Sequence, residues 1–180
     1  IQSALLALQG GIEGGLAAAE LLVGDGNPSG KTVDTFAKSL DDYPSTYNFH
    51  ESRDYVNYTD DIYVGYRYFE TIPGAAEKVV YPFGYGLSYT TFDVETVSAG
   101  VVNSNCTSEA NKLYAKVRVT NTGKFSGKEV VQVYIAKPQG KLGKPAKELA
   151  AFEKTRELQP GESQLMILTW EINDMASYDD

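Results

Sequence analysis

Hydrophobic and β-prone positions in the first half of the chain predict one helix and a few short strands separated by loops. Residues 12–23 are Ala-rich and place apolar side chains near one face of a helix, and Gly24 is a natural C-terminal stop. Residues 32–36 and 62–69 are rich in β-branched and aromatic side chains, which predicts strands. Residues 37–61 show no clear period and hold the only histidine, so we interpret them as a surface loop.

From about residue 91 the pattern changes to short alternating runs of apolar and polar residues. Turn signals such as Asn-Thr-Gly and Pro-Gly separate these runs. Alternation with a period of two is typical of half-buried strands. The pattern therefore predicts five strands, near residues 94–102, 113–120, 129–135, 147–153 and 163–170.

These patterns predict an α/β segment over residues 1–90, followed by an all-β sandwich over residues 91–180. Regular short strands of this kind indicate an immunoglobulin or fibronectin type III-like sandwich, which has about seven strands, so five strands predict an incomplete one. The chain begins at Ile1, in what reads as the middle of an element, without the basic region that opens a signal peptide. We therefore expect a fragment of a longer polypeptide.

Composition narrows the classes of function. A net charge of −8 argues against nucleic acid as a partner, because binding a phosphate backbone needs clustered Lys and Arg. No apolar run approaches the ~20 residues of a membrane span, so no membrane partner is expected. The single cysteine, Cys106, excludes an internal disulfide. We expect a cytoplasmic bacterial protein in preference to a secreted one.

Two near-miss motifs overlap after the predicted helix. Residues 24–32 resemble a phosphate-binding P-loop, but Asp25 stands where the motif needs its first Gly. The same stretch resembles a calcium loop, but Phe36 stands where that loop needs a bidentate Glu. A nucleotide-binding domain using Lys31 is one alternative reading. We predict no cofactor and no metal, and we assign no catalytic, cofactor-binding or metal-ligating residue.

Other candidate chemistry is sparse. Glu13 lies near the start of the predicted helix, where an acid interacts favourably with the helix dipole. His50 and Cys106 fall in different predicted domains, which argues against a catalytic Cys–His pair.

Seven of the 13 tyrosines fall in residues 58–89. Aromatic rings at strand positions pack between sheets or domains more often than they stack on sugars, so we favour packing. Arg67, between Tyr66 and Tyr68, could stack on a ring or pair with a carboxylate. An exposed row of Tyr66, Tyr68 and Tyr85 would instead favour a non-catalytic carbohydrate-binding or adhesion module.

The run Pro-Phe-Gly-Tyr-Gly-Leu-Ser-Tyr-Thr-Thr-Phe at residues 82–92 is aromatic, glycine-punctuated and uncharged, as expected at a packed junction between domains. It resembles a signature of glycoside hydrolase family 3, the β-glucosidases and their relatives. Other stretches resemble the same family in the same order. They are residues 10–15, 24–31 and 63–69 for the C-terminal part of its α/β sandwich domain, and 121–123, 127–134, 147–149, 152–154 and 160–162 for its fibronectin type III-like domain.

The resemblance implies a parent enzyme that hydrolyses β-glucosides or related oligosaccharides with retention, using one carboxylate as nucleophile and a second as acid/base. In the family the nucleophile is an Asp from a TIM-type barrel, and the acid/base is usually a Glu upstream in the α/β sandwich. Neither motif is found in these 180 residues. We therefore expect this chain to be inactive alone, to line the cleft as a structural element and to have the missing barrel as its partner. Residues 70–74 and 174–180 resemble members that carry the barrel after the fibronectin-like domain.

Overall fold

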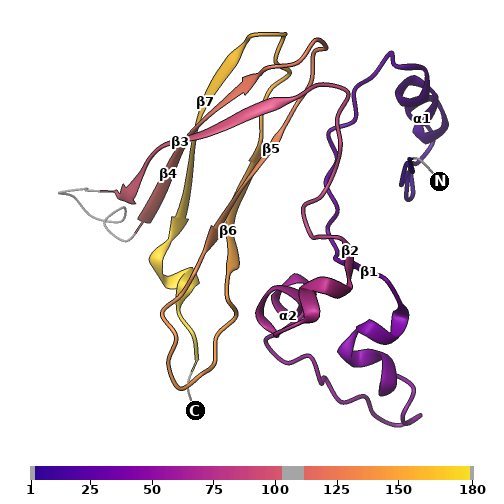
Figure 1. Cartoon of the computed structure of the whole chain (residues 1–180), viewed down its shortest axis with the longest axis vertical. Coiled ribbons are helices and arrows are strands. Elements are labelled where there is room, and N and C mark those ends of the chain that lie inside the picture. The colour runs from indigo at the N-terminus through magenta and orange to yellow at the C-terminus, as the bar shows by residue number, and fades with distance from the viewer. Residues whose placement is uncertain (1–2, 103–111, 179–180) are drawn as a thin grey trace.

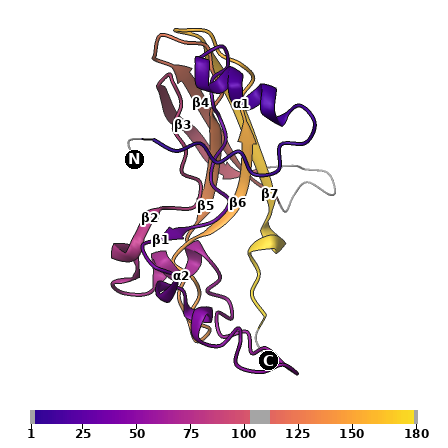
Figure 2. The same ribbon diagram turned by 90° about the vertical axis from the view of Figure 1, so that its right-hand side faces the viewer.

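The structure is a computed structural model that describes residues 3–102 and 112–178. Two parts lie side by side along the molecule (Figure 1): a sandwich of strands, and an N-terminal part of short helices and strands. In both views α1 lies toward one end of the sandwich and α2 toward the other (Figure 2). Cys106 lies outside the described residues.

Two antiparallel sheets build the sandwich. The larger has the strand order β3-β4-β7, with β3 at Phe92–Val101, β4 at Lys112–Asn121 and β7 at Ser163–Glu171. The smaller pairs β5 at Val130–Ile135 with β6 at Glu148–Lys154. All five predicted strands are confirmed, as is the fold class of an α/β segment followed by a fibronectin type III-like sandwich.

Alternation along β4 explains why the two sheets pack face to face. Ala115, Val117 and Val119 are all at most 5% exposed, whereas Arg118 between the last two is exposed. Since successive strand residues point to opposite faces, only one face of β4 enters the core. That core also contains Val131, Leu158, Met166 and Leu168.

A buried asparagine closes one end of the core. Asn121 is completely buried, and its amide accepts from Thr90 Oγ1 at 2.8 Å and Gly123 N at 3.0 Å. It donates to the carbonyl oxygens of Phe125 and Leu158, both at 2.8 Å. The Asn-Thr-Gly turn is therefore fixed by a fully satisfied side chain, as a buried polar group requires.

The N-terminal part contains the predicted helix, slightly shortened. Helix α1 spans Gly14–Val23 and ends at Gly24, whose left-handed φ of 88° suits glycine. Strand β1, Phe36–Ala37, pairs antiparallel with β2, Val79–Tyr81. The predicted strand over residues 32–36 is wrong except at its last residue, because the backbone before it bonds to the 82–85 turn instead of a strand.

The predicted strand over residues 62–69 is also wrong. Gly65, with φ 60°, breaks the extended backbone, and helix α2 runs from Tyr66 to Thr71. Phe69 on this helix is 1% exposed, and other α2 side chains contact residues 146–149 of the sandwich. Tertiary contacts thus override the β-prone composition of this segment.

The predicted loop over residues 37–61 holds two short 3-10 helices, η1 at Leu40–Asp42 and η2 at Pro44–Tyr47. Tyr43 between them donates to the Thr35 carbonyl at 2.8 Å, which ties this segment to β1.

None of the helices in the described part of the chain is long and apolar enough to cross a membrane. The domain division at residue 90 stays a prediction. Two further 3-10 helices, η3 and η5, cover Ala75–Lys78 and Ile172–Met175.

Candidate functional site

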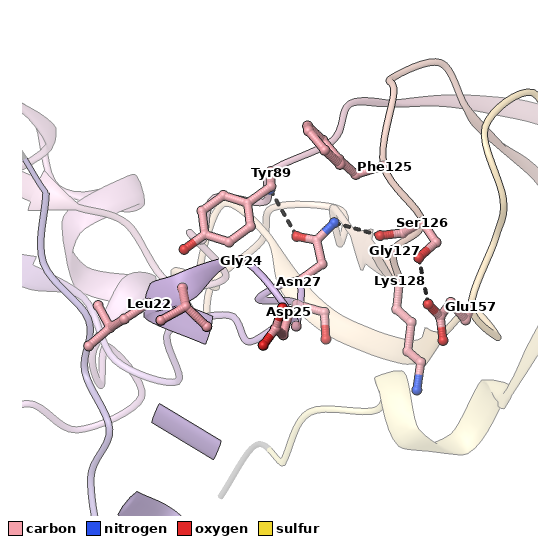
Figure 3. Close-up of a pocket in the computed structure, with 13 residues that line it drawn as sticks. Leu22, Gly24, Asp25, Asn27, Tyr89, Phe125, Ser126, Gly127, Lys128 and Glu157 are labelled. Atoms are coloured by element: carbon pink, nitrogen blue, oxygen red, sulfur yellow. Dashed lines mark hydrogen bonds between the residues drawn. The ribbon is translucent and has the colours of Figure 1, made fainter. Parts of the chain in front are cut away.

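At the junction between the two parts of the chain, the loop after α1 meets the aromatic signature and the loop before β5. At its centre, Asn27 Nδ2 donates to the Ser126 carbonyl at 2.8 Å (Figure 3). Asn27 Oδ1 accepts from Ser88 Oγ at 2.8 Å and from Tyr89 N at 2.9 Å. We call these four residues the Asn27 cluster. One side chain therefore joins the loop after α1, the aromatic signature and the loop before β5.

Lys31, the lysine of the P-loop-like run, is part of the same junction. Its Nζ pairs with Glu129 Oε1 at 2.8 Å and donates to the Gly86 carbonyl at 3.0 Å, and both side chains of the ion pair are 16–17% exposed. A phosphate-binding lysine must reach into open space, whereas this one is engaged by the sandwich. The structure therefore argues against the nucleotide-binding alternative.

The glycines of the aromatic signature allow close approach of backbone to backbone. A Cβ on Gly86 would lie 2.2 Å from the Gly30 carbonyl oxygen. Beside it, Thr32 N donates to the Tyr85 carbonyl at 2.7 Å, and Gly84 N donates to the Thr32 carbonyl at 2.8 Å. The signature thus runs against the loop that follows α1, which explains its glycine spacing.

The start of β6 holds α2 against the sandwich. Tyr66 Oη accepts from Leu149 N at 2.8 Å, and Arg67 pairs with Glu148 at 3.2 Å. Glu70 pairs with Lys147 at 2.7 Å. Of the roles considered for Arg67, the structure shows pairing with a carboxylate.

Packing accounts for most of the tyrosine cluster. The Tyr66 ring lies 4.8 Å from Phe83 and 5.9 Å from Tyr134, centroid to centroid. Tyr68 packs on Phe69, and Tyr85 packs on Tyr81. Tyr66 and Tyr68 are half-buried and only Tyr85 is exposed, at 38%, so the three rings do not form the exposed row that would favour an adhesion module. Burial, and secondly the nearby Tyr66, raise the pKa of the Tyr134 hydroxyl.

A groove of about 770 Å³ opens beside the Asn27 cluster. One wall is the C-terminal end of α1 with the loop that follows it, and the other is the loop before β5 (Figure 3). Its size falls in the range of roughly 300–1,000 Å³ typical of small-molecule sites. Its lining mixes aromatic, aliphatic and charged side chains: Leu22, Val23, Asp25, Asn27, Ser29, Tyr89, Phe125, Ser126, Lys128 and Glu157.

The remaining residues singled out from the sequence do not join this site. His50 stacks on Phe49, with ring centroids 3.9 Å apart, in the segment between β1 and α2. Glu13 occupies the N-cap position of α1, but its side chain accepts no hydrogen bond from the helix among the described residues. Those residues also contain no group of three or more His, Cys, Asp or Glu placed to hold a metal ion.

Sequence reasoning missed the roles of Asn27 and Asn121. Local sequence indicates only turns at these positions, because Asn-Pro and Asn-Thr-Gly are strong turn signals. The available signal was the amide itself, since Asn offers a donor and an acceptor that a buried turn can use together. Their partners lie up to 99 residues away in sequence, which local patterns do not indicate.

Two family models match the chain. Residues 1–89 match the glycosyl hydrolase family 3 C-terminal domain, and residues 129–180 match the fibronectin type III-like domain. β-Glucosidase A of Butyrivibrio fibrisolvens is 62% identical over 188 residues, an alignment that covers 100% of this chain and 23% of that protein. A β-glucosidase of Ruminococcus albus is 46% identical, over 96% of this chain and 17% of that protein.

Solved structures show the same likeness. A β-glucosidase from Paenibacillus barengoltzii superposes with a TM-score of 0.84 at 52% identity, over 93% of this chain and 17% of that one. β-Glucosidase 3B from Thermotoga neapolitana gives a TM-score of 0.84 at 43% identity, over 97% of this chain and 23% of that one. The chain thus spans less than a quarter of the length of these relatives.

Proposed function

Since this chain belongs to glycoside hydrolase family 3, with part of the C-terminal domain and the fibronectin type III-like domain, we propose that it is the structural portion of a retaining β-glucosidase. The observation that carries the proposal is the 62% identity to a β-glucosidase across the whole chain. The substrate would be a β-glucoside or a β-linked oligosaccharide. A TIM-type barrel elsewhere in the longer protein would be its partner.

The chemistry assigned to the longer protein needs two carboxyl groups. In retaining enzymes they lie about 5–5.5 Å apart, one attacking the anomeric carbon and the other protonating the leaving oxygen. Glu162, an acid with a clear pKa shift, has its pKa lowered by a hydrogen bond from Arg156. A general acid needs a raised pKa, so this surface pair does not fit the role. Since neither catalytic motif of the family is found in these 180 residues, we propose that both catalytic carboxylates lie outside this chain.

The role of this chain would be to hold one wall of the active-site cleft in position. The Asn27 cluster, the Lys31–Glu129 pair and the contacts of α2 fix the sandwich against the N-terminal part at three places. Holding such a wall rigid matters, because small displacements of a catalytic group cost large factors in rate.

Hydrolysis of p-nitrophenyl β-glucoside tests the proposal. The purified 180-residue chain should release no nitrophenol above the buffer rate, and the longer protein that contains it should turn over with retention, visible as β-glucose in early NMR spectra. Turnover by the chain alone, or no β-glucosidase activity in the longer protein, would refute it.

A further inference from the structure

The groove beside the Asn27 cluster is lined by two aromatic rings together with polar and charged side chains. Tyr89 and Phe125 lie on one side of Asn27, and Asp25, Lys128 and Glu157 lie on the other (Figure 3). The two rings are 49% and 60% exposed. A pyranose presents C–H groups on its faces and hydroxyls around its edge, so it needs a ring to pack on and polar groups beside it.

We propose that this groove binds a glucosyl unit of a β-linked gluco-oligosaccharide. Phe125 would pack on the face of the sugar ring, with the edge of Tyr89 beside it. Asp25 would accept hydrogen bonds from the sugar hydroxyls, and Lys128 would donate to them. The choice of sugar rests on the proposed function, whereas the capacity to bind a pyranose rests on the groove itself.

Charge in the groove favours a neutral polyhydroxyl ligand. The lining carries both negative charges, on Asp25 and Glu157, and a positive charge, on Lys128. A strongly acidic or strongly basic ligand would therefore meet at least one charge of its own sign. Glu157 Oε1 already accepts from Ser126 Oγ at 2.7 Å. Within the described residues Asp25 and Lys128 form no ion pair and no side-chain hydrogen bond, which leaves their polar atoms for a ligand.

Contacts within the chain hold both walls of the groove in place. Asn27 bonds across the base of the groove to Ser126, and Tyr89 Oη donates to the Leu21 carbonyl at 2.7 Å, which fixes the ring. A Cβ on Gly127 would lie 2.7 Å from Asn27 Nδ2, so the loop before β5 must approach this closely. A site formed in advance loses less conformational entropy on binding.

Phe125 is suited to a test by substitution, because its side chain is exposed and only its backbone carbonyl accepts the hydrogen bond from Asn121. Phe125→Ala removes the ring and leaves that backbone hydrogen bond in place. Phe152 on β6 is a matched control, since it is 69% exposed and does not line the groove. Asp25→Ala serves as a second variant that removes a polar contact.

The experiment is a titration of the isotopically labelled chain with cellobiose, followed by amide chemical shifts, with glycerol at the same hydroxyl concentration as the control. We expect saturable shifts confined to residues 22–29, Tyr89 and residues 125–128. Phe125→Ala should raise Kd about three- to tenfold, the range expected for one aromatic contact, and Phe152→Ala should leave it unchanged.

Three results would overturn the proposal: no saturable shift with tens of millimolar cellobiose, shifts that glycerol reproduces, or equal effects of the two Phe variants. If Phe125→Ala does not fold, as judged by its own spectrum, an unchanged Kd for Asp25→Ala would overturn it. Each result is independent of hydrolysis by the longer protein, so this proposal and the proposed function can fail separately.

Discussion

Replacing Asn27 by Ala tests the junction with one change. The amide of Asn27 accepts from Ser88 Oγ and Tyr89 N and donates to the Ser126 carbonyl, at 2.8–2.9 Å. The bond to Ser126 joins the N-terminal part to the sandwich, and the other two join the loop after α1 to the aromatic signature that leads into β3. Alanine removes all three and leaves the apolar core unchanged, because Asn27 lies outside it.

The loss of stability follows from the number of bonds and their burial. A typical hydrogen bond contributes about 0.5–1.5 kcal/mol net, so three bonds bracket roughly 1.5–4.5 kcal/mol. Asn27 is only partly buried and Tyr89 is 49% exposed, so water can replace some of the lost partners. We therefore expect Asn27→Ala to lower the free energy of unfolding by about 2 kcal/mol.

Urea unfolding followed both by fluorescence of the single tryptophan, Trp170, and by far-ultraviolet circular dichroism would measure this loss. Asn173→Ala, at an exposed position in η5, is the matched control and should cost less than about 0.5 kcal/mol. If the two variants unfold with the same free energy within 0.5 kcal/mol, the junction is not held as described.

Three more predictions concern other contacts. Asn121→Ala should cost about 3–4 kcal/mol by urea unfolding, because it removes four hydrogen bonds at a fully buried site; a loss under 1 kcal/mol would show that water replaces them. A double-mutant cycle of Lys31→Met and Glu129→Gln should give a coupling of about 1 kcal/mol, since this ion pair is mostly shielded from solvent; zero coupling would contradict its role. The raised pKa of Tyr134 predicts that its stabilising contribution is complete below the unfolded value near pH 10 and is lost as the pH rises through the folded pKa. The free energy of unfolding of Tyr134→Phe should therefore fall less than that of the wild type above pH 10. In a titration followed by absorbance at 295 nm, the variant should lack one tyrosine that ionises at higher pH than an ordinary tyrosine.

Elements that depend on local pattern were predictable. The five strands follow from alternation of period two, and α1 follows from its Ala-rich composition and the stop at Gly24. The aromatic run at residues 82–92 predicts a packed junction, and the structure places it against the loop after α1, with Gly84 close to Gln132 of β5. In each case the local preference and the tertiary environment agree.

Features that depend on distant partners were not predictable. Helix α2 has β-prone residues, yet burial of Phe69 and four polar contacts with residues 146–149 make it helical. The groove combines Asp25 with Phe125, which lie 100 positions apart in the sequence. Only the folded chain brings such residues together, since no periodicity links them.

Covalent labelling locates the chemistry of the proposed enzyme. A 2-deoxy-2-fluoroglucoside with a good leaving group should trap the glycosyl-enzyme intermediate of the longer protein, and peptide mass mapping would identify the labelled carboxylate. We predict a label on a residue outside the 180 residues of this chain. A label on any of its 24 Asp and Glu residues would contradict the conclusion that this chain supports the reaction without performing it.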